Sequence, residues 1–153
     1  MAIRNILTQE DETLRKKCKP VEKFDEKLWE LLDDMAETLE KAAGVGLAAP
    51  QVGIIRRLAI VDTGEEIIEM INPTITKSSG NQRDIEACLS CPKLAGYVTR
   101  PMKCTVKAQD RNGKFYEKEF PAGLLSRCAC HEIDHLDGHL FFDIADEMVD
   151  VED

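Results

Sequence analysis

The stretch CACHEIDHLDGHLFF, residues 128–142, is the part of the chain from which both the fold and the chemistry can be read. It continues a helical spacing of apolar residues that starts at Ala122, and Gly138 is a typical stop signal for a helix. The pattern therefore predicts a helix over 122–138. This helix carries two histidines, a glutamate and two cysteines, so it is expected to hold the functional side chains.

The HEIDH segment of this helix has the spacing of a metal site. Residues four apart on a helix point the same way, so His131 and His135 can bind one metal ion. Glu132 lies about 100° further round the helix, where its carboxylate can accept a proton from a water on the metal. The pattern also occurs by chance in amphipathic helices, with both histidines on a solvated surface. Two ligands alone do not make a firm site, so a third ligand decides between these interpretations.

A thiolate is available as the third ligand in the segment EACLSCP, residues 86–92, where Cys88 and Cys91 are both candidates. Two imidazoles and one thiolate leave the fourth position of a tetrahedral metal open to water, which is typical of catalytic sites. A zincin-type peptidase would take its third ligand downstream, where the sequence offers only His139 and glutamates of an acidic tail. The other alternative is a closed four-thiolate zinc or redox cluster, which would leave both histidines and the glutamate without a role.

A second amphipathic helix is expected near the N-terminus. Over residues 24–42 the apolar residues recur at helical spacing, with Asp25 as the N-cap and Gly44 as the stop. The segment GVGLAAPQVG, residues 44–53, contains too many glycines and small residues for a long regular element. We therefore expect an irregular loop between this helix and the first strand.

Short strands fill the middle of the chain. The segments 56–62 and 65–73 are predicted as strands, and residues 103–121 form two alternating runs around the Asn-Gly pair at 112–113, the strongest short-range signal for a hairpin. Strands combined with two well-separated helices indicate an α+β fold. In this fold, short antiparallel or mixed strands pack around the central helix that carries HEIDH. No linker divides residues 1–153, so a single catalytic domain is expected.

The composition disfavours several kinds of partner. The chain has 153 residues, 43% of them hydrophobic and 32% charged, and its net charge of −9 disfavours nucleic acids and anionic membranes. Its apolar runs are too short to span a bilayer and its N-terminus has no signal-peptide core, so a cytoplasmic location is expected. There the six cysteines stay reduced, which favours metal binding or catalysis over disulfides. Cys18 and Cys104 are each expected to be small buried residues.

Three ordered segments resemble the motifs of the peptide deformylase family. GVGLAAPQ at 44–51 is similar to the family's first motif, EACLS at 86–90 to its second, and CHEIDHLDG at 130–138 to its third. Three motifs in the right order are far more specific than any one of them, and the similarity extends over nearly the whole chain. The resemblance implies a metal-dependent hydrolase that removes the formyl group from N-formylmethionine at the start of nascent peptides and releases formate.

The resemblance also implies a role for each residue of the motifs. The metal ligands are Cys88, His131 and His135. Glu132 is the general base for the attacking water, and the Gln51 side chain and the Leu89 backbone N–H stabilise the oxyanion. The implied cofactor is one divalent metal ion, Fe²⁺ in cells, for which Zn²⁺, Ni²⁺ or Co²⁺ can substitute.

A pocket for the substrate methionine is implied between the first and third motifs. Val45, Leu124 and Cys128 are expected to line it, with ordinary core packing as the alternative for Leu124. Gly46 permits a close approach, so an extended peptide can pair with exposed backbone there. For the glycine-rich segment taken alone, an ordinary turn is the simpler interpretation.

Three positions depart from the family pattern. Ala87 stands where the family usually has glycine, Cys130 replaces its usual glutamine, and Cys91 replaces an aliphatic residue. Because the implied ligands and base are all present, we expect an active enzyme rather than a catalytically silent relative. The extra thiols are expected to make it sensitive to oxidation.

Charged residues support two further expectations. Glu86 and Arg100 are expected to form a buried pair that supports the strand before the thiolate ligand, because a charge next to a metal ligand needs a partner. Some family members carry a long basic C-terminal helix implicated in ribosome docking, whereas residues 143–153 of this chain are acidic. Any contact with the ribosome is therefore expected to use another surface.

Overall fold

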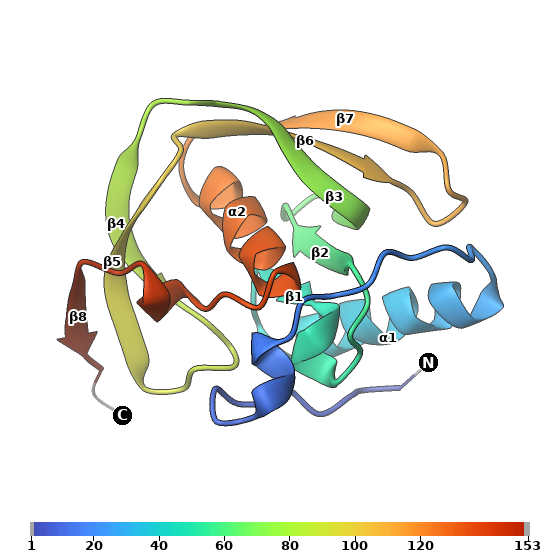
Figure 1. The fold of residues 1–153 in the computed structure, drawn as a ribbon, viewed down its shortest axis with the longest axis horizontal. Helices are drawn as coiled ribbons and strands as arrows, with labels where there is room; N and C mark the ends of the chain where they lie inside the picture. The colour runs from blue at the N-terminus through green and yellow to red at the C-terminus, as the bar shows by residue number, and fades with distance from the viewer. Residues whose placement is uncertain (1, 152–153) are drawn as a thin grey trace.

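Two α-helices and two antiparallel sheets make up residues 2–151, the part of the chain that the computed structural model describes (Figure 1). The helices are α1 (Glu26–Ala42) and α2 (Leu124–Leu136), and short 3-10 turns occur at η1 (Glu12–Arg15), η2 (Ala49–Val52) and η3 (Phe141–Asp143). One sheet has the strand order β1 (Gly46–Ala48), β2 (Leu58–Asp62), β3 (Ile67–Ser79), β6 (Lys103–Gln109) and β7 (Phe115–Phe120). The other has the order β4 (Gln82–Ala87), β5 (Leu94–Arg100) and β8 (Glu147–Asp150). The predicted α+β class is confirmed.

Strand β2 forms the centre of the hydrophobic core because both of its faces are covered. Successive side chains of a strand point to opposite faces. Leu58 and Ile60 pack in the cluster that contains the apolar face of α1, whereas Ala59 and Val61 pack in the cluster of α2. All four side chains are fully buried, and burial of one the size of Leu58 contributes about 1.5–3 kcal/mol. The two helices therefore pack on opposite faces of the five-stranded sheet.

Helix α1 begins at the predicted cap and ends at Ala42 as predicted, but the residue that terminates it is not the one expected. The Asp25 side chain accepts a hydrogen bond from the Leu28 N–H at 3.2 Å, which confirms the N-cap. At the other end Ala43, and not Gly44, has the left-handed conformation, with a φ of 55°. Gly44 serves packing instead, since a Cβ there would lie 2.8 Å from Cδ1 of Leu89. The predicted end of the helix is therefore confirmed, and the prediction was wrong only in giving the terminating role to Gly44, since Ala43 adopts the left-handed conformation.

The five-stranded sheet agrees with the predicted strands in position but not in length. The segment 56–62 becomes β2, and 65–73 becomes β3, which continues six residues further along the chain to Ser79. The predicted hairpin at 112–113 is confirmed as the β6–β7 connection. The loop expected at 44–53 contains the three-residue strand β1, which pairs antiparallel with β2.

The three-stranded sheet carries no clear signal in the sequence. Strand β4 reads QRDIEA, and its buried residue is Glu86, while its neighbour Ile85 is 49% exposed. This pattern is the reverse of a half-buried strand with apolar residues inward. Glu86 pairs with Gly96 of β5, and β8 comes from the acidic tail, so the sheet joins segments far apart in the chain. The sheet forms through tertiary contacts, which the hydrophobic pattern of each short segment does not predict.

Helix α2 lies between the two sheets (Figure 1), as predicted for the helix that carries HEIDH. It is shorter than the predicted 122–138, because Gly123 and Gly138 have φ values of 103° and 81° and lie outside it. Ten of its 13 residues are buried, including charged ones. Buried polar groups need partners or a chemical role. Within residues 2–151, neither helix has the length and apolar character needed to cross a bilayer.

Replacing Gly138 by alanine is expected to destabilise the fold. Its φ is 81°, and a Cβ there would lie 2.5 Å from the carbonyl oxygen of Arg15. Left-handed strain and a clash with backbone together lower the free energy of unfolding by about 2–4 kcal/mol, measurable by urea denaturation. Gly64→Ala is the matched control, because its φ is 91° but no atom of residues 2–151 lies within 4 Å of an added Cβ. Equal losses in the two variants would contradict the clash.

Candidate metal centre and active site

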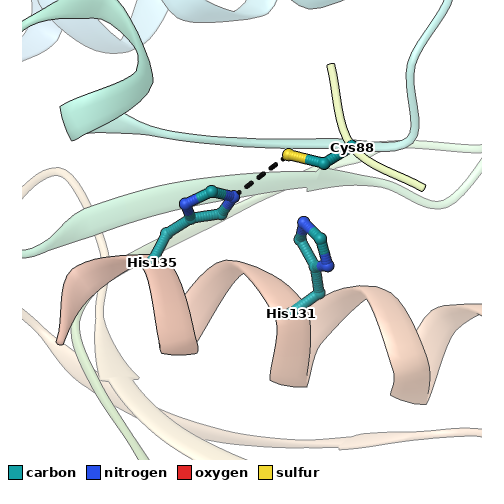
Figure 2. A group of neighbouring side chains, drawn as sticks. All are labelled: Cys88, His131 and His135. Atoms are coloured by element: carbon teal, nitrogen blue, oxygen red, sulfur yellow. Dashed lines mark hydrogen bonds between the residues drawn. The ribbon is translucent and has the colours of Figure 1, made fainter. Parts of the chain in front are cut away.

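Cys88, the first residue after β4, faces His131 and His135 of α2 (Figure 2). The Cys88 Sγ lies 3.3 Å from the His135 Nε2, and one ligand atom from each of the three residues lies within 4.8 Å of the others. Both imidazoles are buried, and Cys88 is half-buried. Two imidazoles and a thiolate at these separations match the ligand set of a tetrahedral site with one open position. The three side chains therefore fit a divalent metal ion.

The other ring nitrogen of His131 is held by a carboxylate. Glu86 Oε2 lies 2.6 Å from His131 Nδ1, and Glu86 also accepts hydrogen bonds from Arg100 at 2.7 and 3.1 Å and from Arg127 at 2.8 Å. Burial opposes ionisation, but the hydrogen bonds from His131 and Arg100 bring the pKa of Glu86 down to about 2. An ionised carboxylate only accepts, so His131 Nδ1 donates and its Nε2 lone pair is left for a metal. The predicted Glu86–Arg100 pair is confirmed. Arg127 also donates to Glu86, which the sequence did not predict.

Glu132 is buried beside the two histidines. Within residues 2–151 its Oε1 has no hydrogen-bond partner, and the Cys128 thiol approaches its Oε2 at 3.9 Å. Burial raises the pKa of the Glu132 carboxyl to about 7. A carboxyl with a pKa near neutrality can both take up and release a proton at physiological pH.

Gln51 is held in one orientation by two hydrogen bonds. Its Oε1 accepts the Ala48 N–H at 2.9 Å, and its Nε2 donates to the Ser90 hydroxyl at 3.0 Å. The same Nε2 lies 3.5 Å from the Cys88 Sγ, so the amide nitrogen faces the metal centre. Ser90 is fully buried and was missed by the sequence analysis, although its place inside EACLS was a signal.

A cavity of about 300 Å³ opens beside these side chains, between segments 44–46, 85–89 and α2. The predicted substrate residues all line it, namely Val45, Gly46, Leu124 and Cys128. Gln51, Leu89 and Glu132 line it as well. Leu124 is 62% exposed, which excludes the alternative of ordinary core packing. Ile85 is a further lining residue that the sequence analysis did not identify.

The positions that depart from the family pattern lie in different environments. Ala87 lines the cavity. Cys130 is buried in the same cluster as Cys104, and its thiol lowers the pKa of Cys104. Neither Cys91 nor Cys130 joins the Cys/His/His group, which is the cluster of metal-ligating side chains that residues 2–151 contain. The four-thiolate alternative therefore has no counterpart in the described part of the chain.

Gly46 is the point at which the glycine-rich segment meets the buried carboxylate. A Cβ at this position would lie 2.6 Å from the Cys128 Sγ and 2.7 Å from the Glu132 Oε2. Gly46→Ala is expected to displace Glu132, the general base that the family resemblance implies, and to lower the turnover number by about a hundredfold, because misplacement of such a group by about 1 Å has that cost. Steady-state kinetics on formylated peptides, the substrate that the resemblance implies, measures the loss. An unchanged turnover number in a folded variant would show that the carboxylate does not depend on this contact.

Comparison with known proteins agrees with this geometry. A family model described as polypeptide deformylase matches residues 3–150. The chain belongs to the polypeptide deformylase family. It is 56% identical over 143 residues to the peptide deformylase of Caldicellulosiruptor bescii, covering 94% of this chain and 86% of that protein. It is 48% identical over 150 residues to peptide deformylase 2 of Clostridium acetobutylicum, covering 97% and 99% of the two chains.

Solved deformylase structures share the fold. A peptide deformylase from Legionella pneumophila matches with a TM-score of 0.91 at 49% identity, covering 94% of this chain and 86% of that one. A Synechococcus elongatus deformylase in complex with actinonin matches with a TM-score of 0.90 at 36% identity, covering 94% and 79%. The resemblance inferred from the three motifs is confirmed, and with it the hydrolase class.

Proposed function

We propose that this deformylase-family protein removes the formyl group from N-formylmethionine at the start of nascent peptides and releases formate. The observation that carries the proposal is the Cys/His/His cluster beside the buried Glu132, at the wall of a substrate-sized cavity. Amide hydrolysis needs an activated water, a proton acceptor and donors for the oxyanion. The wall of the cavity offers side chains suited to each task.

The metal centre consists of Cys88, His131 and His135. When bound there, a divalent metal supplies Lewis-acid activation of water. We assign Fe²⁺ as the ion used in cells, with Zn²⁺, Ni²⁺ or Co²⁺ as substitutes, because imidazole and thiolate ligands accept all four. Glu86 keeps His131 in the tautomer that ligation requires, since it accepts the Nδ1 proton at 2.6 Å.

Glu132 is the general base in this proposal. Its carboxylate takes a proton from the attacking water and then delivers it to the amine nitrogen that leaves. Burial raises its pKa, which favours uptake of the proton from water. Its Oε1 has no hydrogen-bond partner within residues 2–151, so one oxygen is available for this proton.

Gln51 and the backbone N–H of Leu89 are assigned as donors to the oxyanion. Gln51 supports this role because its Oε1 is fixed by Ala48, which directs the Nε2–H group toward Cys88 at 3.5 Å. A donor held in place before the reaction costs no reorganisation when charge develops. Removal of one such donor costs about a hundredfold in rate or more.

The substrate methionine is assigned to the cavity wall formed by Val45, Leu124 and Cys128. Leu124 is 62% exposed at this wall, so an apolar ligand would cover it. Strand β1, which begins at Gly46, lies at the edge of the five-stranded sheet, so the peptide backbone can pair with it in extended form. Because backbone pairing does not depend on side chains, many residue types are expected to be accepted at the substrate positions after methionine.

Formate release from a formyl-Met tripeptide by anaerobically purified, iron-loaded protein tests this function. We expect formate in proportion to enzyme, and no acetate from the acetyl-Met tripeptide used as the control. A protein that binds one metal ion per chain and releases no formate would overturn the proposal and favour a catalytically silent relative. Ala87 and the altered cysteines would then be the first positions to restore to the family pattern.

We assign the activity to the cytoplasm. Nascent formylated peptides emerge there, and its reducing conditions suit a chain whose six cysteines are all free. Ribosome contact is proposed to avoid residues 143–150, because Asp143, Asp146 and Glu147 would meet ribosomal RNA with like charge.

A further inference from the structure

Cys91 lies in a tight turn with the thiol of the metal centre. The Cys91 N–H donates to the Cys88 carbonyl oxygen at 3.0 Å, which closes a turn directly after β4. Such a turn keeps the two Cα atoms within about 7 Å, and a disulfide spans roughly 4.4–6.8 Å between Cα atoms. The turn therefore brings the two Cα atoms to a separation that a disulfide can span.

The two sulfurs differ in their access to small molecules. Cys88 is half-buried on the wall of the cavity, whereas Cys91 is 1% exposed and packs with Val98 and Phe141. A small oxidant that enters the cavity meets Cys88 first. Cys91 is shielded from the oxidant but next to the sulfur that reacts, which is the arrangement of a reacting thiol and a resolving thiol.

We propose that hydrogen peroxide converts Cys88 and Cys91 into a disulfide and that this bond releases the metal ion. The Cys88 sulfur attacks one peroxide oxygen, so an S–O bond forms, the O–O bond breaks, and hydroxide leaves and is protonated to water. The Cys91 sulfur then attacks the Cys88 sulfur, so the S–S bond forms and the S–O bond breaks. The second oxygen leaves as water with the Cys91 proton. Two thiols are oxidised and one peroxide is reduced to two waters.

Metal release follows from the loss of the thiolate. A disulfide sulfur carries no negative charge, so only His131 and His135 remain as ligands, and two ligands hold a divalent ion weakly. Reduction by a dithiol restores both thiols, which makes the change reversible. Without a resolving thiol, a sulfenic acid at Cys88 would instead proceed to sulfinic and sulfonic acids, which thiols do not reduce. Cys91 therefore protects the metal centre from irreversible damage. This second part of the proposal rests on the assignment of Cys88 as a ligand.

Mass spectrometry of zinc-loaded protein tests the disulfide directly. Trypsin cleaves after Arg83 and Lys93, so both cysteines fall in one peptide, 84–93. After limited peroxide, a catalase quench and alkylation, we expect this peptide to be lighter by two hydrogen atoms and to carry no alkyl group. A chelating dye should register the loss of most of the bound zinc in parallel. Dithiothreitol followed by zinc should reverse both changes.

Two variants make the outcome decisive. In Cys91→Ala the same peptide should gain oxygen atoms, and dithiothreitol should no longer restore most of the zinc binding. Cys104→Ala removes a thiol from the separate buried pair with Cys130, so it should respond as the wild type does. A wild-type peptide 84–93 that stays a dithiol, or a disulfide from Cys88 to Cys128, would overturn the proposal. A Cys88–Cys91 disulfide that forms with full retention of zinc would overturn the metal-release step. Neither readout uses turnover, so a protein that fails to deformylate peptides leaves this test intact.

Discussion

Glu132→Gln is expected to lower the turnover number by about 10²–10⁴-fold while the protein still binds one metal ion per chain. Glu132 is a buried carboxylate at the wall of the cavity beside the metal centre, and general acid–base catalysis contributes a factor of that size. An amide of the same shape keeps the packing against Cys128 but cannot take a proton from water. The measurement is the rate of formate release from a formyl-Met tripeptide, with metal content determined on the same sample.

Glu117→Gln provides the control for this change, because Glu117 is an exposed residue of β7. It removes the same charge and should leave the turnover number within about twofold, since exposed substitutions away from the site have small effects. If Glu132→Gln retained wild-type turnover, the proton acceptor would have to be another group. If it lost the metal ion as well, the loss of activity would no longer identify Glu132 as the base.

The core around β2 was predictable because it depends on local pattern. Alternation over residues 58–61 sends two side chains to each face, and the helical spacing of α1 and α2 supplies an apolar stripe for both faces. The motif HEIDH likewise predicted the shared direction of His131 and His135, because one helical turn separates them. These features depend only on the residue spacing within one helix or strand, so they can be predicted from a single sequence.

The three-stranded sheet and the charge network were not predictable in the same way. Glu86 sits on a strand whose apolar neighbours face outward, so its burial looks unfavourable until Arg100, Arg127 and His131 are placed around it. Those partners come from β5 and α2, which are distant in the chain. A strand with a polar inward side chain can be buried when residues distant in the sequence supply its hydrogen-bond partners. The spacing of residues within the strand does not predict those partners.

The cavity shows the same division between local and distant information. The sequence indicated that Gly46 allows a close approach, but not what approaches it. The structure identifies the neighbours as Cys128 and Glu132, within 2.9 Å of an added Cβ. The choice of a third ligand between Cys88 and Cys91 was also open from spacing alone, and the structure places Cys88, not Cys91, in the group with the two histidines.

Cys88→Ala is expected to lower metal affinity by more than about a hundredfold and to abolish measurable deformylation with it. Loss of a residue that only supports a ligand already costs about 10–100-fold in affinity, so loss of the thiolate itself should cost more. The imidazoles of His131 and His135 would remain, buried and 4.9 Å apart between ring centroids, but two neutral ligands do not offset the charge of a divalent ion. Competition with a chelator of known affinity measures the change.

Cys91→Ala is the matched control, since it removes a thiol three residues away from the same turn. It should keep metal affinity within about threefold, because Cys91 does not belong to the group of three ligand atoms that lie within 4.8 Å of one another. The reverse result, in which Cys91→Ala loses the ion and Cys88→Ala keeps it, would exchange the two thiols as third ligand. Equal losses in both variants would mean that the turn, rather than one sulfur, holds the metal centre together. Only a large loss confined to Cys88→Ala supports the open three-ligand site on which hydrolysis depends.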